Sequence, residues 1–227
     1  SVTEIGEFAF SGCTGLTSVS FTPLNSVTYI GAGAFSGCIG LTSVSIPNHV
    51  SRIEEWTFER CTSLTSITIP NSVTEIGTNA FGYCSSLASI TIPNSVLTLG
   101  EYAFAGCSSL TSITIPNSVQ EIGQSAFWDC SSLTSVSIPN SVTFIGDYAF
   151  LNCISLTSVS IPNSVTEIYD GTFNNCSSLT AITIPNSVTE IDYAAFAGCS
   201  SLTSITCDAA TAPALGESAF SDVPSSA

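Results

Sequence analysis

The sequence predicts an α/β solenoid, a fold in which short strands and turns repeat along one axis. Nine cysteines, from Cys13 to Cys199, recur with one step of 25 residues and then seven steps of 23. A phenylalanine stands three residues before each cysteine and a leucine three residues after it. A fixed period in this range is the signature of stacked repeats. Because so short a unit cannot enclose its own apolar side chains, neighbouring units must bury them.

The first part of each unit predicts a strand. In Leu64–Ile69, β-branched apolar residues alternate with small polar ones, as in a strand with one buried side. Pro70 follows at once and removes a backbone donor, so the strand is expected to end there. Each unit therefore contributes one short strand.

The rest of the unit brings the chain back. The segment 73–77 is expected to reverse its direction. In 80–87, apolar residues lie three and four positions apart, which predicts one turn of α- or 3₁₀-helix. A solenoid with strands on one side and short turns or helical segments on the other follows.

The two ends of the repeat array depart from the unit. Residues 1–206 hold the nine units, and we interpret the longer first step as a bulge in the loop around residues 21–26. Residues 207–227 predict a degenerate closing unit, in which Cys207 replaces an isoleucine and the pattern resumes at Leu215. We expect a single solenoid domain. Because Ser1 falls within a unit, we also expect sequence to precede it.

The unit Leu-x-x-Ile-x-Ile-Pro, followed by Ile-Gly-x-x-Ala-Phe-x-x-Cys-x-x-Leu, resembles the BspA-like class of leucine-rich repeats, which is found on surface proteins of bacteria and of some protozoan parasites. The resemblance covers nearly the whole chain. It implies a curved right-handed solenoid with a parallel sheet on the concave face and the turns on the convex face. It also implies adhesion to host or neighbouring cells, often through extracellular-matrix proteins, although a fold alone does not fix a function.

Charge and composition exclude several classes of partner. The chain has 17 acidic residues, two arginines and no lysine, for a net charge of −15. It lacks the basic cluster that nucleic acid or an anionic membrane surface requires. No run approaches the roughly 18 consecutive apolar residues of a spanning helix, so no membrane insertion is expected in this segment. The acidity itself is interpreted as a solubility device.

The cysteines and the single histidine give little support to chemistry. Nine of the ten cysteines share one position among interior residues, which predicts reduced thiols acting as small hydrophobes. No Cys-x₂-Cys or Cys/His cluster suggests zinc. With one histidine, His49, and no lysine, we predict no enzyme activity, no cofactor and no metal. The sequon at Asn175 leaves glycosylation open.

The positions that vary between units carry the functional hypothesis. Three and two residues before the phenylalanine, alternate units place an acid and then an aromatic residue, as in Glu55–Trp56, Glu101–Tyr102 and Asp147–Tyr148. One interpretation is packing, with each large ring lying over a small residue of the next unit. The other is a row of exposed aromatic and acidic side chains that binds a basic protein surface, a sugar chain or a second solenoid. Both stay open at this stage.

The third unit adds both arginines of the chain, and Trp128 and Tyr83 extend the same side. We therefore expect a non-enzymatic cell-surface or secreted protein that binds a protein ligand, such as a host surface or extracellular-matrix protein. The rival hypothesis is a structural spacer or self-assembling unit of a surface layer or fibre. The candidate partner-binding residues are Arg52, Glu55, Trp56, Arg60, Glu101, Tyr102, Trp128, Asp147 and Tyr148.

Overall fold

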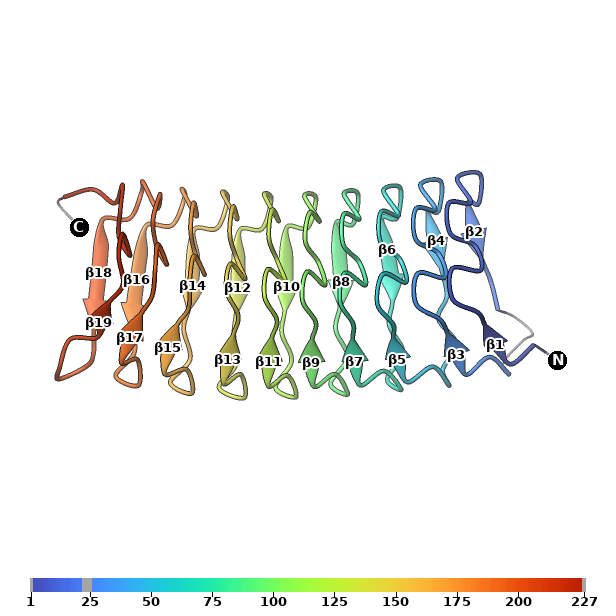
Figure 1. Ribbon diagram of the computed structural model, residues 1–227, viewed down its shortest axis with the longest axis horizontal. Helices are drawn as coiled ribbons and strands as arrows, with labels where there is room; N and C mark the ends of the chain where they lie inside the picture. Colours follow the sequence, from blue (N-terminus) through green and yellow to red (C-terminus); the bar gives the residue numbers. More distant parts are fainter. Residues whose placement is uncertain (1, 22–25, 226–227) are drawn as a thin grey trace.

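A computed structural model of the chain describes residues 2–21 and 26–225. These residues form a solenoid whose coils stack side by side along one axis (Figure 1). We number the coils 1 to 10 by the phenylalanine that each contributes to a central stack, from Phe10 to Phe220. Most of the loop in which a bulge was predicted lies outside the described residues.

The first strand of each coil follows the sequence prediction. Within Leu64–Ile69, residues Ser66–Thr68 form a strand whose Ile67 is buried while its two neighbours are exposed. The strands of this first ladder are β2 (Ser18–Val19), β4 (Ser43–Val44), β6 (Ser66–Thr68), β8 (Ser89–Thr91), β10 (Ser112–Thr114), β12 (Ser135–Ser137), β14 (Ser158–Ser160), β16 (Ala181–Ile184) and β18 (Ser204–Cys207). They pair in four short sheets, β2-β4, β6-β8, β10-β12-β14 and β16-β18, and within each sheet they are parallel and in register, with Ile113 opposite Val136.

The returning segment forms a second parallel ladder, which the sequence analysis treated only as a connection. Each of its strands has two residues, and in all but the first and last strands an isoleucine or leucine is buried while the other residue points outward, as in Glu75–Ile76. The strands of the second ladder are β1 (Glu4–Ile5), β3 (Tyr29–Ile30), β5 (Arg52–Ile53), β7 (Glu75–Ile76), β9 (Thr98–Leu99), β11 (Glu121–Ile122), β13 (Phe144–Ile145), β15 (Glu167–Ile168), β17 (Glu190–Ile191) and β19 (Ala214–Leu215). The solenoid therefore has strands on two sides of each coil.

The predicted helical turn is wrong. Residues 2–21 and 26–225 contain no helix, so the fold is a parallel β-solenoid rather than α/β, and no helix here is long and apolar enough to span a membrane. In place of helical bonds, three amides of each turn reach the next coil. In coil 3 these bonds run from Trp56 N–H to Thr78 O, from Phe58 N–H to Ala80 O and from Arg60 N–H to Gly82 O, with N···O distances of 2.9, 2.9 and 2.7 Å.

The backbone conformation explains why no helix forms. Trp56 and Arg60 adopt φ values of +55° and +56°, and the corresponding residues of other coils share this left-handed conformation. A helix needs right-handed dihedrals in succession and directs its amides along its own axis. With a left-handed residue on each side of Phe58, the turn directs alternate amides toward the neighbouring coil instead.

The interior is a stack of aligned side chains. Ten phenylalanine rings follow one another with centroids 5.1 to 5.7 Å apart, and the eight from Phe35 to Phe196 have no exposed surface. The eight cysteines from Cys38 to Cys199 are buried beside them, as predicted, whereas Cys13 at the ninth such position is exposed. Each of the eight buried thiols donates to the phenylalanine carbonyl of the preceding coil, as from Cys61 Sγ to Phe35 O at 3.3 Å. Burial raises the pKa of the Cys61 thiol to about 12.

The last coil keeps the stack in a modified sequence. Cys207 lies opposite Ile184 in the pairing of β18 with β16, which confirms it as a strand residue in an isoleucine position. The Phe220 ring stacks on Phe196 at 5.1 Å. The residues after Ile205 therefore continue the same side chain stack.

Candidate interaction surfaces

The turn segments present a surface that we call the turn face. It comprises the residues two before, one after and two after each stacked phenylalanine, and it includes five of the candidate residues. The other candidates lie elsewhere: Glu55, Glu101 and Asp147 border this face, and Arg52 lies in β5 of the second ladder. The five candidates on the turn face are Trp56, Arg60, Tyr102, Trp128 and Tyr148.

Aromatic rings of the turn face lie over glycines of the following coil. A Cβ added to Gly33 would lie 2.3 Å from the ring of Phe8, and one added to Gly171 would lie 2.4 Å from the ring of Tyr148. The ring of one coil therefore occupies the space that a side chain would take in the next. The alternation of large and small residues contributes packing between coils, as the first interpretation expects.

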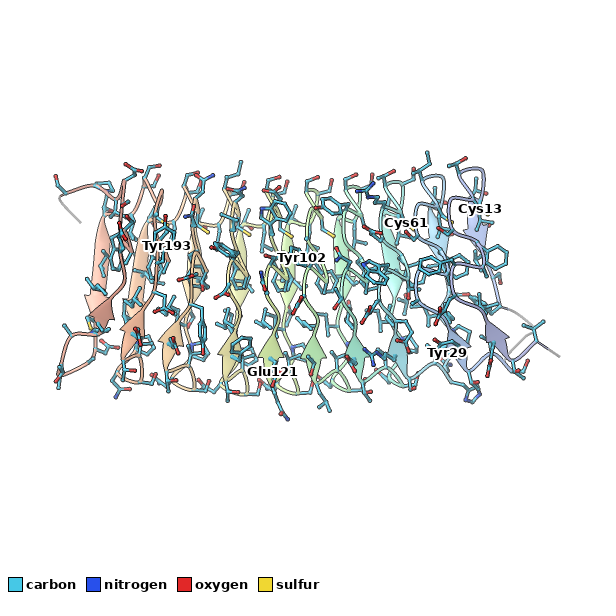
Figure 2. All side chains as sticks on the ribbon, viewed as in Figure 1. Cys13, Tyr29, Cys61, Tyr102, Glu121 and Tyr193 are labelled. Atoms are coloured by element: carbon cyan, nitrogen blue, oxygen red, sulfur yellow. The ribbon has the colours of Figure 1, made fainter. Side chains whose placement is uncertain are left out.

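Three aromatic side chains from successive coils meet near the middle of the turn face. The Trp128 ring lies edge to face with Tyr102 and Tyr83, with centroids 6.3 and 6.5 Å away. The Arg60 guanidinium carbon lies 5.7 Å from the centroid of the Tyr83 ring. We call Arg60, Tyr83, Tyr102 and Trp128 the aromatic cluster, and the position of Tyr102 halfway along the solenoid is visible in Figure 2.

The aromatic cluster has partly exposed rings and one polar atom that makes no hydrogen bond to the described residues. All three rings are partly exposed. Nε1 of Trp128 is buried and finds no hydrogen-bond partner among the described residues. Trp56, two coils before Tyr102, is 36% exposed on the same face. Half-exposed aromatic side chains held by their neighbours are typical of contact surfaces between proteins.

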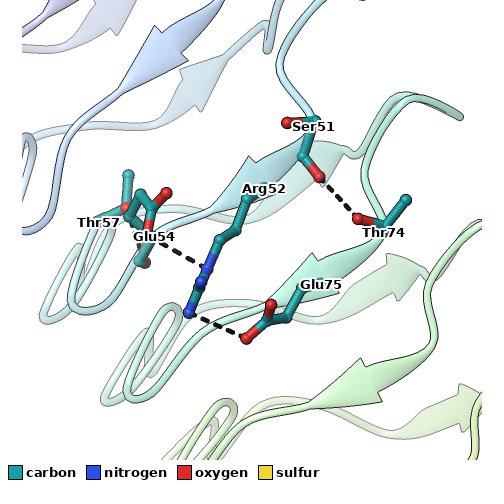
Figure 3. Close-up of polar contacts among 6 residues, drawn as sticks. All are labelled: Ser51, Arg52, Glu54, Thr57, Thr74 and Glu75. Carbon is teal, nitrogen blue, oxygen red and sulfur yellow. Dashed lines mark hydrogen bonds and ion pairs between the residues drawn. The ribbon is translucent and has the colours of Figure 1, made fainter.

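Arg52 belongs to an ion-pair network rather than to the turn face (Figure 3). Its Nε lies 3.2 Å from Glu54 Oε2, and its Nη2 lies 2.9 Å from Glu75 Oε1 in the neighbouring coil. The hydroxyl of Thr57 donates to the Glu54 carbonyl at 2.8 Å. These contacts tie Arg52 to the surface of its own solenoid, so the two arginines of the chain do not act together.

The acidic residues gather on one side, which we call the acidic flank. It consists of the outward residues of the second ladder, the position two residues after them, and the position three before each stacked phenylalanine. The outward residues of the first ladder, by contrast, are uncharged serines, threonines and one alanine. Thirteen of the 17 acidic residues lie on this flank: Glu4, Glu7, Glu54, Glu55, Glu75, Glu101, Glu121, Asp147, Glu167, Asp170, Glu190, Asp192 and Glu217.

A groove of about 330 Å³ runs along the acidic flank in the middle of the chain. Glu101, Glu121 and Asp147 line it together with Phe144, whose side chain is 38% exposed. In Figure 2, Glu121 lies at the lower edge of the solenoid, away from Tyr102. In a sequence pair such as Glu101–Tyr102, the acid therefore belongs to the acidic flank and the aromatic residue belongs to the turn face.

A cluster of carboxylates lies nearer the C-terminal end of the flank. Glu167, Glu190 and Asp192 place carboxylate oxygens within 4.8 Å of one another. Burial, a hydrogen bond to Glu167 and repulsion by the neighbouring acids raise the pKa of Asp192 to about 6. These residues could hold a hard divalent cation. The prediction of no metal rested on cysteine and histidine spacing, which gives no signal for a cluster of carboxylates.

A broken glycine column is the signal that could have revealed this region. The residue after the buried isoleucine of the second ladder is usually glycine, because a Cβ at Gly100 would lie 2.6 Å from the backbone of the preceding coil. Three coils have Glu54, Tyr169 or Asp192 there instead. Each of them makes a specific contact with a side chain of the acidic flank, so departures from the repeat mark the places where side chains interact.

A polar groove of about 1020 Å³ follows the first ladder. Hydroxyl side chains such as Thr91 and Thr114 line it, together with the exposed asparagines after each proline, such as Asn94 and Asn117. Asn175 of the sequon lies on the turn face instead, where it is exposed and donates from Nδ2 to Asn152 Oδ1 at 2.8 Å.

The two parallel ladders, the interior stacks and the absence of helix in the described residues define a repeat scaffold of stacked β-coils. The family profile described as "BspA type Leucine rich repeat region (6 copies)" matches residues 1–111 and 98–226. The chain belongs to this family. Comparison with curated proteins gives no match.

Solved structures agree with this assignment. A leucine rich cell surface protein from Faecalibacterium prausnitzii is 31% identical, with a TM-score of 0.55, over 91% of this chain and 70% of that one. The leucine rich repeat protein of T. pallidum is 30% identical, with a TM-score of 0.63, over 81% of this chain and 78% of that one. A leucine-rich repeat protein from Eubacterium ventriosum shares the fold at 24% identity and a TM-score of 0.56, over 97% and 80% of the two chains.

Proposed function

We propose that this chain is a non-enzymatic binding module of a cell-surface protein, which mediates adhesion by binding a protein ligand through its turn face. The observation that carries the proposal is the aromatic cluster, in which Trp128 holds Tyr83 and Tyr102 partly exposed. The Arg60 side chain adds a hydrogen-bonding group beside Tyr83. The description of the F. prausnitzii structure as a cell surface protein supports the location.

A rigid scaffold favours binding by such a surface. Tyr83 packs on Gly106 and Tyr102 packs on Trp128 of the next coil, so little side chain freedom is lost when a partner covers these rings. Truncation of central tryptophan and tyrosine residues in protein interfaces commonly weakens binding by about 2 kcal/mol or more. The turn face is also the part of the coil where side chains differ most between units, which gives a surface with a distinct pattern along its length.

The test compares the chain with the variant Trp56→Ala/Tyr102→Ala/Trp128→Ala. Purified extracellular-matrix proteins such as collagen and laminin are immobilised, and binding is measured by surface plasmon resonance. The control variant Thr91→Ala/Thr114→Ala changes exposed residues of the first ladder, and thermal unfolding verifies that each variant folds. We expect the aromatic variant alone to lose at least about tenfold in affinity. Equal affinity of all three proteins would overturn the proposed role of the turn face.

Sedimentation of the same proteins over a range of concentration addresses self-assembly. If the chain associates with itself and the aromatic variant does not, the turn face joins copies of the solenoid and the structural role takes precedence over adhesion. A monomer at all concentrations supports the binding module.

A further inference from the structure

The acidic flank is an exposed sheet face whose charge is not balanced within the chain. Arg52 is its single basic residue, and both of its ion pairs are made at one end, with Glu54 and Glu75. From β9 to β19 the outward row and the two positions beside it contain no cation. The charge is also one-sided, because the outward residues of the first ladder are uncharged.

Neighbouring carboxylates of the flank repel one another. Glu167 and Glu190 are directly opposite in the pairing of β15 with β17, an arrangement that destabilises a sheet when both residues are ionised. Repulsion by Asp170 adds to burial in raising the pKa of Asp147, which lines the groove. Binding of a cation to this face is therefore electrostatically favourable, because it relieves the repulsion between the carboxylates.

An aromatic pair lies among these acids. The rings of Phe144 and Tyr169, in adjacent coils, have centroids 5.2 Å apart, and Phe144 is 38% exposed and lies opposite Glu121 in the pairing of β11 with β13. Each replaces a residue that is usually small or polar, since the corresponding positions are Thr98 in one row and Gly100 in the other. An exposed ring next to carboxylates is suited to an arginine or lysine side chain, whose cation contacts the ring and whose stem covers it.

We propose that the acidic flank between β9 and β17 is the docking surface for an extended segment of a partner protein that carries several lysine or arginine residues. The groove beside Glu101, Glu121 and Asp147 takes its cationic side chains, and the Phe144–Tyr169 pair contacts one of them. A second copy of this chain is not a suitable partner. The acidic flanks of the two copies would repel each other, and the chain has only two arginines and no lysine to contact them. The inference rests on the proposed function only in taking the chain to be a binding module.

The test uses fluorescently labelled peptides of alternating lysine and serine, with glutamate replacing lysine in the control peptide, and measures binding by anisotropy. The flank variant is Glu121→Gln/Asp147→Asn/Glu167→Gln. The matched control, Glu59→Gln/Asp129→Asn/Asp208→Asn, changes the net charge equally at acids outside the flank. We expect the flank variant to weaken binding of the lysine peptide at least about tenfold, and the control less than about threefold. Phe144→Ala should weaken it about two- to fivefold.

Equal weakening by the two triple variants would show that the peptide responds to net charge alone and would overturn the proposal. Calcium titrated in place of peptide provides a second decision: tight binding of calcium alone, with exclusion of the peptide, would make the flank an ion site instead. Because this assay uses no matrix protein and the flank variant leaves the turn face intact, its failure is separate from failure of the proposed function. Loss of matrix binding in the aromatic variant with peptide binding retained would confirm that the two surfaces are distinct.

Discussion

At the scale of single residues, the buried cysteine position requires a small side chain that donates one weak hydrogen bond. The thiol of Cys107 donates to the Phe81 carbonyl at 3.2 Å, and the same carbonyl accepts the amide of Cys84. Burial raises the pKa of the Cys107 thiol well above its ordinary value. The column therefore consists of neutral thiols that bridge adjacent coils, which goes beyond the small hydrophobes predicted from the sequence.

The contact of Tyr148 with Gly171 gives a test of packing on the turn face. We expect Gly171→Ala to lower the free energy of unfolding by about 1 to 3 kcal/mol, because the new methyl group would meet the Tyr148 ring in a left-handed residue. The double variant with Tyr148→Ala should recover part of this loss. Urea denaturation monitored by circular dichroism measures both.

Gly198→Ala is the matched control for this substitution. Gly198 has φ +74°, but the nearest atom to an added Cβ is 3.3 Å away. Backbone strain should therefore be the larger part of the cost, at roughly 1 kcal/mol, with a small added cost from the tight contact with the Asn175 backbone. If Gly171→Ala and Gly198→Ala cost the same and Tyr148→Ala gives no recovery, the ring does not pack on the glycine.

The carboxylate of Asp192 should make stability depend on pH. Its pKa is raised from 3.8 to about 6, so between these values the folded chain binds more protons than the unfolded chain. The stability contributed by this group is therefore present at low pH and is lost as the pH rises through 6. Asp192→Asn cannot ionise, and we expect it to be more stable than the native chain at pH 7 by roughly 1 kcal/mol after allowance for solvent screening.

Thermal unfolding at pH 4 and pH 7 measures this effect. At pH 4 the two proteins should differ little, because the native carboxyl is then largely protonated when folded. Asp208→Asn, at an exposed acid outside the acidic flank, controls for the change in net charge. A stabilisation of Asp192→Asn that is the same at both pH values would contradict the assignment.

At the scale of elements, the phenylalanine stack holds each coil to its neighbours. Phe127 in coil 6 lies 5.5 Å from the Phe104 ring and 5.2 Å from the Phe150 ring and is completely buried. We expect Phe127→Ala to lower the free energy of unfolding by about 3 to 5 kcal/mol. Phe144→Ala, which removes an exposed ring, should cost under about 1 kcal/mol, and chemical denaturation distinguishes the two.

Location along the stack matters as well, because each coil contacts only its neighbours. Hydrogen exchange of Phe127→Ala should show faster exchange in coils 5 to 7 than in coil 3. A uniform change along the chain would instead indicate that the solenoid unfolds as one unit.

The sequence predicted the first ladder well and the turn badly, for different physical reasons. Ser66–Thr68 shows the alternation of a strand over enough residues to be recognised, whereas the two-residue strand Glu75–Ile76 is too short to show a period. In the turn, apolar spacing predicted a helix. The left-handed conformation of Trp56 and Tyr102 could not be predicted, because nothing in these residue types indicates it. The recurrence of glycine and asparagine at these positions, as in Gly33 and Asn79, was the available signal.

At the scale of the whole molecule, the candidate site stays a prediction from the positions that vary between units. The contact of Trp128 with Tyr83 and Tyr102 could not be predicted from them, because it needs residues from three coils and different positions in the unit. The acidity was interpreted as solubility because a net charge carries no direction. The separation of acids from the hydroxyl side chains became visible only when the register of the second ladder placed Glu121 beside Phe144 and Thr98.

The hydrogen bonds that join the turns of successive coils give the turn face an electrical direction along the solenoid axis. In coil 3 the Phe58 amide reaches coil 4, while the carbonyl of the same peptide group, on Thr57, accepts from Phe35 in coil 2. Peptide dipoles in a β-sheet largely cancel, but the three of each turn point the same way, each with about 3.5 D. Their sum places the negative pole toward coil 1 and the positive pole toward coil 10. A peptide that lies along the turn face and carries charge at one end is therefore more stable in one of its two orientations than in the other.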